Sequence, residues 1–142
     1  MSLKSKAKHF LCLRRHRSDV PTGLVPLSDI STAVIFMDCP EDLLESQKIG
    51  IMGFFKHHGI TVSFLYADDE ELRTSSDLFI SLSVQGGINE RYAAVSSTAR
   101  FKIGRHQLKG DVYDFVVTDG APEPVPALDA FKVIEHFILN IQ

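Results

Sequence analysis

The chain has 142 residues, of which 44% are hydrophobic and 23% charged, and its formal net charge is -3. These values are typical of an ordinary soluble globular protein with one domain around a single core. No stretch approaches the roughly 20 apolar residues of a membrane span, and no secretory apolar segment lies near the start. Cys12 and Cys39 form neither a CxxC motif nor a zinc-ligand spacing. We therefore expect a cytoplasmic protein.

The first 17 residues are strongly basic. They hold six lysines and arginines and no acid (+6), whereas residues 18–142 hold the other 9 basic residues and all 18 acidic ones (-9). The apolar residues of the basic segment follow helical spacing: Leu3, Ala7, Phe10 and Leu11. This pattern favours a helix that packs on its own domain, or a frayed terminus. The alternative is a short basic amphipathic helix that binds an anionic membrane surface or a protein partner.

A linker is predicted to follow this tail. Residues 18–29 contain Pro21, Gly23 and Pro26, which interrupt regular structure. Residues 1–29 are therefore assigned to the basic tail and linker, and residues 30–142 to a single α/β domain.

The domain is predicted to begin with a strand and a helix. Thr32–Met37 is a continuous apolar run, typical of a strand covered on both faces. Pro40 and the acids after it predict the start of a helix that ends near His58, before a glycine cap at Gly59. Two glycines inside this helix are predicted to allow close approach to the sheet: Gly50 and Gly53.

The middle of the chain predicts an edge strand and then a βαβ unit. Ile60–Tyr66 alternates apolar and polar residues, which is typical of an edge strand. Residues 68–76 are acidic and are predicted to form a short helix or turn. A buried strand at Leu78–Leu82, a helix at Asn89–Ser97 and a strand at Ala99–Gly104 then form the βαβ unit.

The last strand repeats the pattern of an earlier one. Residues 113–117 echo residues 76–80, and in each case an aspartate precedes an apolar run. Only residues 106–112 separate the last strand from the one before it, which is short for a helical crossover. The two strands are thus predicted to form an antiparallel hairpin pair, or else to be neighbours joined by an irregular loop, within a mixed sheet. A final helix is predicted over Ala127–Asn140.

Together these elements predict a Rossmann-like, three-layer α/β fold. Its open sheet has about five mostly parallel strands in the order 2-1-3-4-5, the last pair being antiparallel in the hairpin alternative. A basic helical tail precedes it.

The βαβ unit also resembles a known family. The residues that carry the resemblance are Asp77-Leu78-Phe79-Ile80-Ser81-Leu82 and Ser97-Thr98-Ala99-Arg100-Phe101-Lys102-Ile103-Gly104. They resemble a small uncharacterised bacterial α/β domain family of unknown function, in which an FDLLI strand leads through a helix to S-x-A-K-F-x-V-G and another aspartate-led strand. The resemblance covers most of residues 30–140 in the order of elements and is specific over the central 30 residues. It implies a bacterial origin and a fold, without an activity.

The same unit is more distantly similar to the amino-terminal lobe of the heptosyltransferases of lipopolysaccharide assembly. In those enzymes a YDLVIDL strand and a helix precede a short arginine-isoleucine-glycine strand. This chain has Asp38-Cys39-Pro40 where that family has a glycine- and aspartate-bearing turn, and it lacks the nucleotide-sugar-binding lobe. The similarity therefore supports the fold and argues against the activity.

Ligands of open α/β folds bind at the carboxyl ends of the strands, where the strand order reverses. The candidate ligand-binding residues follow the first and third strands: Asp38, Cys39, Ser83, Gln85, Gly86 and Gly87. The two glycines can present N–H groups to an anion at the following helix. Alternatively they only turn the chain, and Ser83→Ala is then close to neutral. The acidic neighbours of Cys39 predict an unreactive thiol.

No catalytic or metal-binding arrangement follows from the spacing of residues. His57 and His58 lie in a last helical turn, where cations complement the helix dipole. The basic residues of 100–109 alternate with apolar ones, which is typical of the solvated outer face of an edge strand. A nucleic-acid-binding face is the alternative for that run.

The sequence thus predicts a non-enzymatic binding or interaction module, with no catalytic residue, metal or cofactor. One alternative is a small ligand-binding protein or transferase-like remnant that uses the loops after the first and third strands. Another is an adaptor whose residues 1–17 bind a protein partner or an anionic membrane surface. A homo-oligomer is compatible with each of these three functions.

Overall fold

The computed structural model describes residues 24–84, 86–117 and 125–141. Within these ranges one parallel sheet has the order β2-β1-β3-β4-β5, as the sequence predicted. Its strands are β1 (Thr32–Met37), β2 (Thr61–Tyr66), β3 (Leu78–Ser81), β4 (Phe101–Gly104) and β5 (Phe115–Val116). The helices are α2 (Glu45–His57), α3 (Ile88–Ser96) and α4 (Ala127–Leu139), with 3-10 turns η1 (Leu27–Asp29) and η2 (Pro40–Asp42). The predicted basic helix of residues 1–17 lies outside the described residues.

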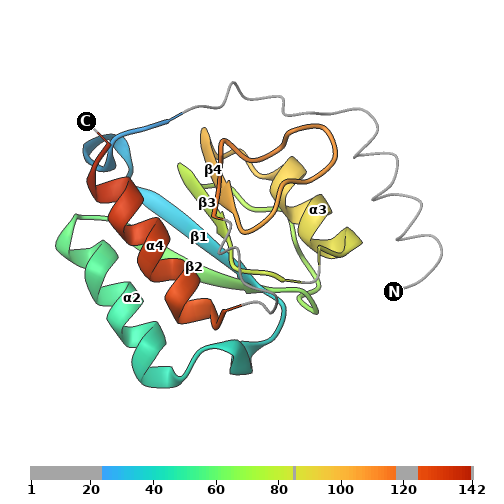
Figure 1. The fold of residues 1–142 in the computed structure, drawn as a ribbon, viewed down its shortest axis with the longest axis horizontal. Helices are drawn as coiled ribbons and strands as arrows, with labels where there is room; N and C mark the ends of the chain where they lie inside the picture. Colours follow the sequence, from blue (N-terminus) through green and yellow to red (C-terminus); the bar gives the residue numbers. More distant parts are fainter. Residues whose placement is uncertain (1–23, 85, 118–124, 142) are drawn as a thin grey trace.

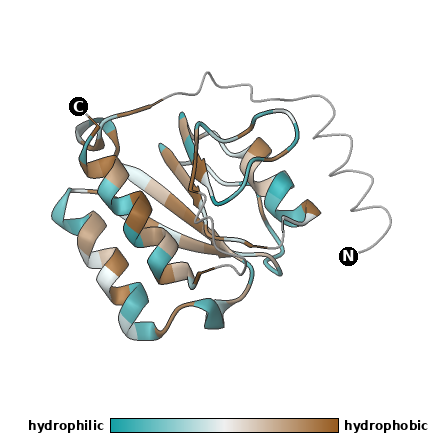
Figure 2. Cartoon of the chain, in the orientation of Figure 1, coloured by the Kyte–Doolittle hydropathy of each residue, from teal (hydrophilic) through white to brown (hydrophobic). Residues whose placement is uncertain are grey.

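Helices cover both faces of the sheet and make three layers. In Figure 1, α2 and α4 lie side by side on one face, and α3 lies on the other. Successive side chains of a strand point to opposite faces. Accordingly, Ile80 of β3 belongs to the core cluster of Phe55 and Phe131 under α2 and α4, and its neighbour Phe79 belongs to the cluster of Tyr92 under α3. Figure 2 shows apolar residues along the strands of the sheet and along α4.

The strands differ in burial according to their place in the sheet. Five of the six residues of β1 and all four of β3 are buried, because helices or loops cover both of their faces. In β2 only Leu65 is buried. β2 forms one end of the strand order, so the predicted edge strand is confirmed.

The prediction of an antiparallel last pair is wrong. Ile103 and Gly104 of β4 pair in parallel with Phe115 and Val116 of β5. The other expected arrangement, neighbours joined by an irregular loop, is the one that forms. This loop turns at Gly110 and Asp111, which adopt φ values of +95° and +54°.

Irregular connections, rather than helices, complete the cover of the α3 face. The connection from β4 to β5 buries Leu108, Val112 and Tyr113 against this face. The stretch 68–76 begins in a turn and continues without a helix or strand, and it places Leu72 in the same cluster. The crossover between two parallel strands therefore needs no helix here, since a loop with apolar side chains also covers the sheet. For this reason the short segment 106–112 led to the wrong prediction of an antiparallel β4–β5 pair.

The helix predicted from Pro40 to His58 is broken near its start. η2 ends at Asp42, and Leu43 has extended φ and ψ angles of -127° and 139°, which bury its side chain in the core. α2 then begins after Leu44, whose N–H donates to Gln47 Oε1 at 2.8 Å. The internal glycines also lie elsewhere than predicted. Gly50 and Gly53 are exposed, and a Cβ at either position would meet no atom within 4 Å.

The basic run at 100–109 does not form an exposed strand face, so that prediction is also wrong. β4 lies between β3 and β5, and Lys102 is fully buried within it. Burial lowers the pKa of Lys102 to about 8, while the charge of Asp114 acts in the opposite direction. Arg105 is 9% exposed. From the sequence, a lysine within a short apolar strand is expected to point to solvent. The alternation of residues does not show that both faces of the sheet are covered at β4.

The repeated aspartates hold neighbouring strands at their amino ends. Asp77 Oδ2 accepts N–H groups of Ser31 and Thr32 at 2.7 and 3.3 Å, next to the start of β1. Asp114 Oδ2 likewise accepts the N–H of Lys102 in β4 at 2.8 Å. The sequence echo therefore has a physical basis, since each carboxylate ties the start of its strand to the adjacent one.

Candidate functional site

The loops that follow β1 and β3 meet at the carboxyl edge of the sheet. Ser83 Oγ donates to Asp38 Oδ1 at 2.6 Å, and the Val84 N–H donates to Asp38 Oδ2 at 3.1 Å. Ser83 is fully buried. Both oxygens of Asp38 thus hold the second loop, and the structure brings these two candidate residues into direct contact.

The glycines after Ser83 turn the chain into α3. Gly86 has a φ of +64°, a region that glycine occupies without steric cost. A Cβ on Gly86 would lie 2.9 Å from His106 Nε2. Gly87 is the N-cap residue of α3, with an ordinary φ of -74°. Gln85, the remaining candidate of this loop, lies outside the described residues.

A buried acid follows in the first turn of α3. Glu90 is 1% exposed, and its Oε2 accepts a 2.5 Å hydrogen bond from the Tyr113 hydroxyl. Burial, followed by the charge and hydrogen bond of Glu90, raises the pKa of Tyr113 well above its ordinary value. His106 Nε2 lies 3.3 Å from Glu90 Oε1, although the two atoms form no hydrogen bond. These residues tie α3 to the connection between β4 and β5.

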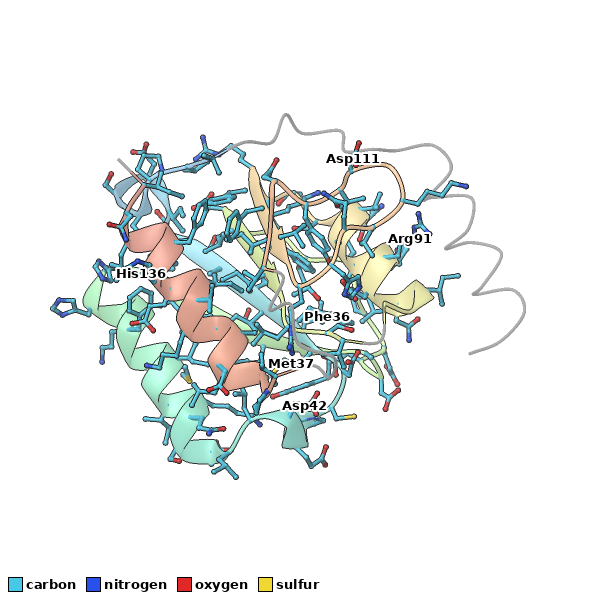
Figure 3. All side chains as sticks on the ribbon, viewed as in Figure 1. Phe36, Met37, Asp42, Arg91, Asp111 and His136 are labelled. Carbon is cyan, nitrogen blue, oxygen red and sulfur yellow. The ribbon has the colours of Figure 1, made fainter. Side chains whose placement is uncertain are left out.

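A pocket of about 340 Å³ opens at the same edge of the sheet. It lies between the ends of β1, β3 and β4 and the start of α4, in the place where open α/β folds bind ligands. Figure 3 shows Asp42 on η2, next to the start of α4. The pocket is lined by Asp38, Cys39, Asp42, Leu82, Val84, Arg105, Val125, Pro126 and Ala127.

Arg105 is a pocket residue that sequence reasoning assigned to an exposed edge. Its Nη2 donates to the Val125 carbonyl at 2.7 Å, and its Nη1 is 3.5 Å from the Leu82 carbonyl. These contacts hold the guanidinium between the end of β3 and the start of α4. The position of Arg105 directly after a strand was the available signal, because carboxyl ends of parallel strands share one edge.

Cys39 lies in the pocket wall with its side chain exposed. Local desolvation and then the charges of Asp42 and Glu41 raise the pKa of its thiol. A raised pKa lowers the thiolate fraction at neutral pH, which is the opposite of what a nucleophilic cysteine needs.

Among residues 24–84, 86–117 and 125–141, no three His, Cys, Asp or Glu side chains gather as metal ligands would. The helices of the same ranges all fall short of the length and apolarity needed to cross a bilayer.

Comparisons with protein-family models, with curated proteins and with solved structures found no significant match. Both family resemblances therefore stay hypotheses.

Proposed function

We propose that this protein is a non-enzymatic binding module whose pocket at the carboxyl edge holds a small zwitterion of the amino-acid type. The observation that carries this proposal is that side chains of opposite charge line the same pocket. Asp38 and Asp42 contribute carboxylates, and Arg105 contributes a guanidinium.

The two kinds of charge come from different walls. Asp42 Oδ2 accepts the Cys39 N–H at 3.2 Å, so η2 keeps this carboxylate beside the end of β1. Arg105 instead contacts Val125, two residues before the start of α4. The amino end of a helix carries partial positive charge, and α4 adds it to the side on which Arg105 lies. A cationic side and an anionic side thus share about 340 Å³.

This division of charge decides between ligand classes. A multiply charged anion such as a nucleotide meets repulsion from two carboxylates, and a simple cation meets repulsion from Arg105. A zwitterion places its carboxylate toward Arg105 and its ammonium group toward Asp42, and both contacts are charge-assisted. The apolar lining of Leu82, Val84 and Val125 is suited to a small side chain.

A thermal-shift and calorimetric screen tests the proposal. The panel contains amino acids, their decarboxylated amines, their deaminated acids, inorganic phosphate and nucleotide sugars. Under the proposal the zwitterions bind most tightly, and a ligand at 100 times its Kd adds about 2.7 kcal/mol of stability. Binding of nucleotide sugars alone would instead favour a transferase-like remnant, and binding of phosphate alone would favour the anion site at Gly86 and Gly87.

Two conservative variants locate the site. Asp42→Asn removes the charge but keeps an oxygen for the Cys39 N–H, and we expect it to weaken zwitterion binding by roughly tenfold or more. Glu41→Gln is the matched control, because Glu41 is adjacent in sequence and lies outside the pocket lining. Equal losses in both variants would indicate general electrostatic attraction rather than a bound ammonium group.

A further inference from the structure

The outer edge of β2 has backbone groups that are open to another strand. Thr61 donates its N–H to Ser31 beside β1, so Val62 and Phe64, at alternate positions, direct their N–H groups outward. Among the described residues, no acceptor for the N–H group of Val62 or Phe64 is present. The Tyr66 N–H, next in the row, donates to Asp69 Oδ2 at 2.9 Å. An open edge therefore extends over Val62 and Phe64 and is closed at Tyr66.

A stripe of exposed residues on α2 lies above this edge. We define the α2 stripe as Glu45, Ile49, Met52, Gly53 and Lys56, whose spacing of i, i+4, i+7, i+8 and i+11 places them on one side of the helix. Ile49 is 63% exposed and Met52 is 47% exposed. The last four residues of the stripe also line an apolar groove of about 460 Å³, together with Ile60, Thr61 and Val62 at the start of β2.

The stripe has an acid at one end and a base at the other. The Ile60 N–H donates to the Phe55 carbonyl at 2.9 Å, so the end of α2, with Lys56, lies beside the start of β2. Lys48 Nζ lies 5.5 Å from the centre of the Tyr66 ring, which places the start of α2, with Glu45, beside the end of β2. α2 and β2 therefore run in opposite directions along the same edge.

From this arrangement we propose that the α2–β2 edge is the interface of a homodimer with two-fold symmetry. Two copies of β2 pair in antiparallel fashion around Ser63, so that Val62 of each copy is bonded to Phe64 of the other. The start of each β2 then lies beside the end of the other. The two α2 helices are antiparallel as well, and Lys56 of each copy meets Glu45 of the other.

The pattern of the α2 stripe favours a second copy of this chain as the partner that covers the groove. Reversing the stripe brings Glu45 against Lys56 and Ile49 against Met52, so its charges and apolar residues complement their own reverse. An isologous interface requires this property, which an unrelated partner does not. The exposed Gly53 admits close helix approach, and Met52 of the other copy fills the groove. The basic segment of residues 1–17 is a poorer fit, because the groove carries Lys56 and no acid.

The test measures the mass and dissociation constant of the full chain by sedimentation velocity and light scattering. The proposal requires twice the 15.8 kDa mass of the chain at micromolar concentration. Met52→Glu and Lys56→Glu, both at exposed positions, are each expected to raise the Kd by roughly tenfold or more. Val133→Glu is the control, since Val133 is 52% exposed on α4, outside the α2 stripe, and its variant is expected to keep the wild-type Kd.

A charge exchange separates the two-fold arrangement from other contacts. The double variant Glu45→Lys with Lys56→Glu restores opposite charges across the axis, so we expect its Kd to return to within about threefold of the wild type. A double variant as weak as Lys56→Glu would overturn the proposed pairing. A monomeric full chain would overturn the proposed dimer. If, in addition, residues 1–17 are cleaved faster by a protease in Met52→Glu than in the monomeric wild type, that segment is the occupant of the groove instead of a second copy.

Discussion

Ser83 and Asp38 lie 45 residues apart in sequence and share a 2.6 Å hydrogen bond at the carboxyl edge of the sheet. Asp38 also accepts the Val84 N–H, so one carboxylate fixes the loop between β3 and α3 against the end of β1. Ser83 therefore has a structural role, and the loop that it anchors forms part of the pocket wall.

The first prediction follows from this bond. Ser83→Ala removes a buried hydroxyl and leaves one Asp38 oxygen without this donor, so we expect a loss of about 1 to 3 kcal/mol in the free energy of unfolding. Urea denaturation measures it, with the exposed Ser28→Ala as control. The same stability in both variants would support the earlier expectation that Ser83 belongs to a simple turn.

A second prediction concerns the close approach of Tyr113 to β4. A Cβ on Gly104 would lie 2.3 Å from the Tyr113 ring, which is held from its other end by Glu90. We expect Gly104→Ala to destabilise the protein by about 1 to 3 kcal/mol through this overlap. Gly50→Ala is the matched control, because it sits in open space on α2 and should stabilise the helix by about 1 kcal/mol. Equal thermal melting temperatures for the two variants would contradict the packing described.

The third prediction concerns pH and the buried Lys102. Its pKa falls from 10.5 to about 8 on folding, so the unfolded chain binds more protons between these values. Stability relative to Lys102→Met should therefore rise from pH 8 to pH 10.5, by an amount on the order of 2 kcal/mol. Below about pH 7 the difference should be constant, because Lys102 is then charged in both states.

Urea titrations of both proteins at several pH values provide the measurement. Tyr113 also titrates at high pH, but it is present in both proteins, and its effect cancels in the difference. A difference in stability that stays constant from pH 7 to pH 10.5 would show that Lys102 has an ordinary pKa.

A fourth prediction concerns the Cys39 thiol. Its pKa is raised, through desolvation and the charges of Asp42 and Glu41, so its thiolate fraction at pH 7 is below that of a free cysteine. We expect iodoacetamide to alkylate Cys39 more slowly than a model thiol, despite its exposure. Asp42→Asn should raise the rate. A wild-type rate above that of the model thiol would revive a nucleophilic role for Cys39.

Much of the sheet could be predicted from the sequence because its signals are local. The apolar run of β1, the alternation in β2 and the aspartates before β3 and β5 each report a strand without knowledge of its neighbours. The parallel β4–β5 pair could not be predicted, because it depends on a loop that buries Leu108 and Val112 as a helix would. Likewise Lys102 and Arg105 appear exposed until both faces of β4 are seen to be covered.

The candidate site was predicted in part for a related reason. Asp38 and Ser83 follow predicted strands, so the rule for carboxyl ends places them together. The sequence does not show that Ser83 and Asp38 lie close enough to form a hydrogen bond with each other. Arg105 completes the pocket because the carbonyls of Val125, just before α4, and Leu82, just after β3, both lie within its reach.

Isothermal titration calorimetry with a zwitterionic amino acid and its two singly charged analogues tests the central claim most directly. The account predicts that a zwitterion from the panel binds the full chain, and that the matching amine and acid bind at least roughly tenfold more weakly, since each lacks one charge-assisted contact. It further predicts that Asp42→Asn reduces the affinity for the zwitterion but does not reduce that for the acid, because the acid has no ammonium group and is repelled by the Asp42 carboxylate. If no zwitterion binds, or if the acid alone binds as tightly as the zwitterion, the pocket of Asp38, Asp42 and Arg105 does not have the function proposed.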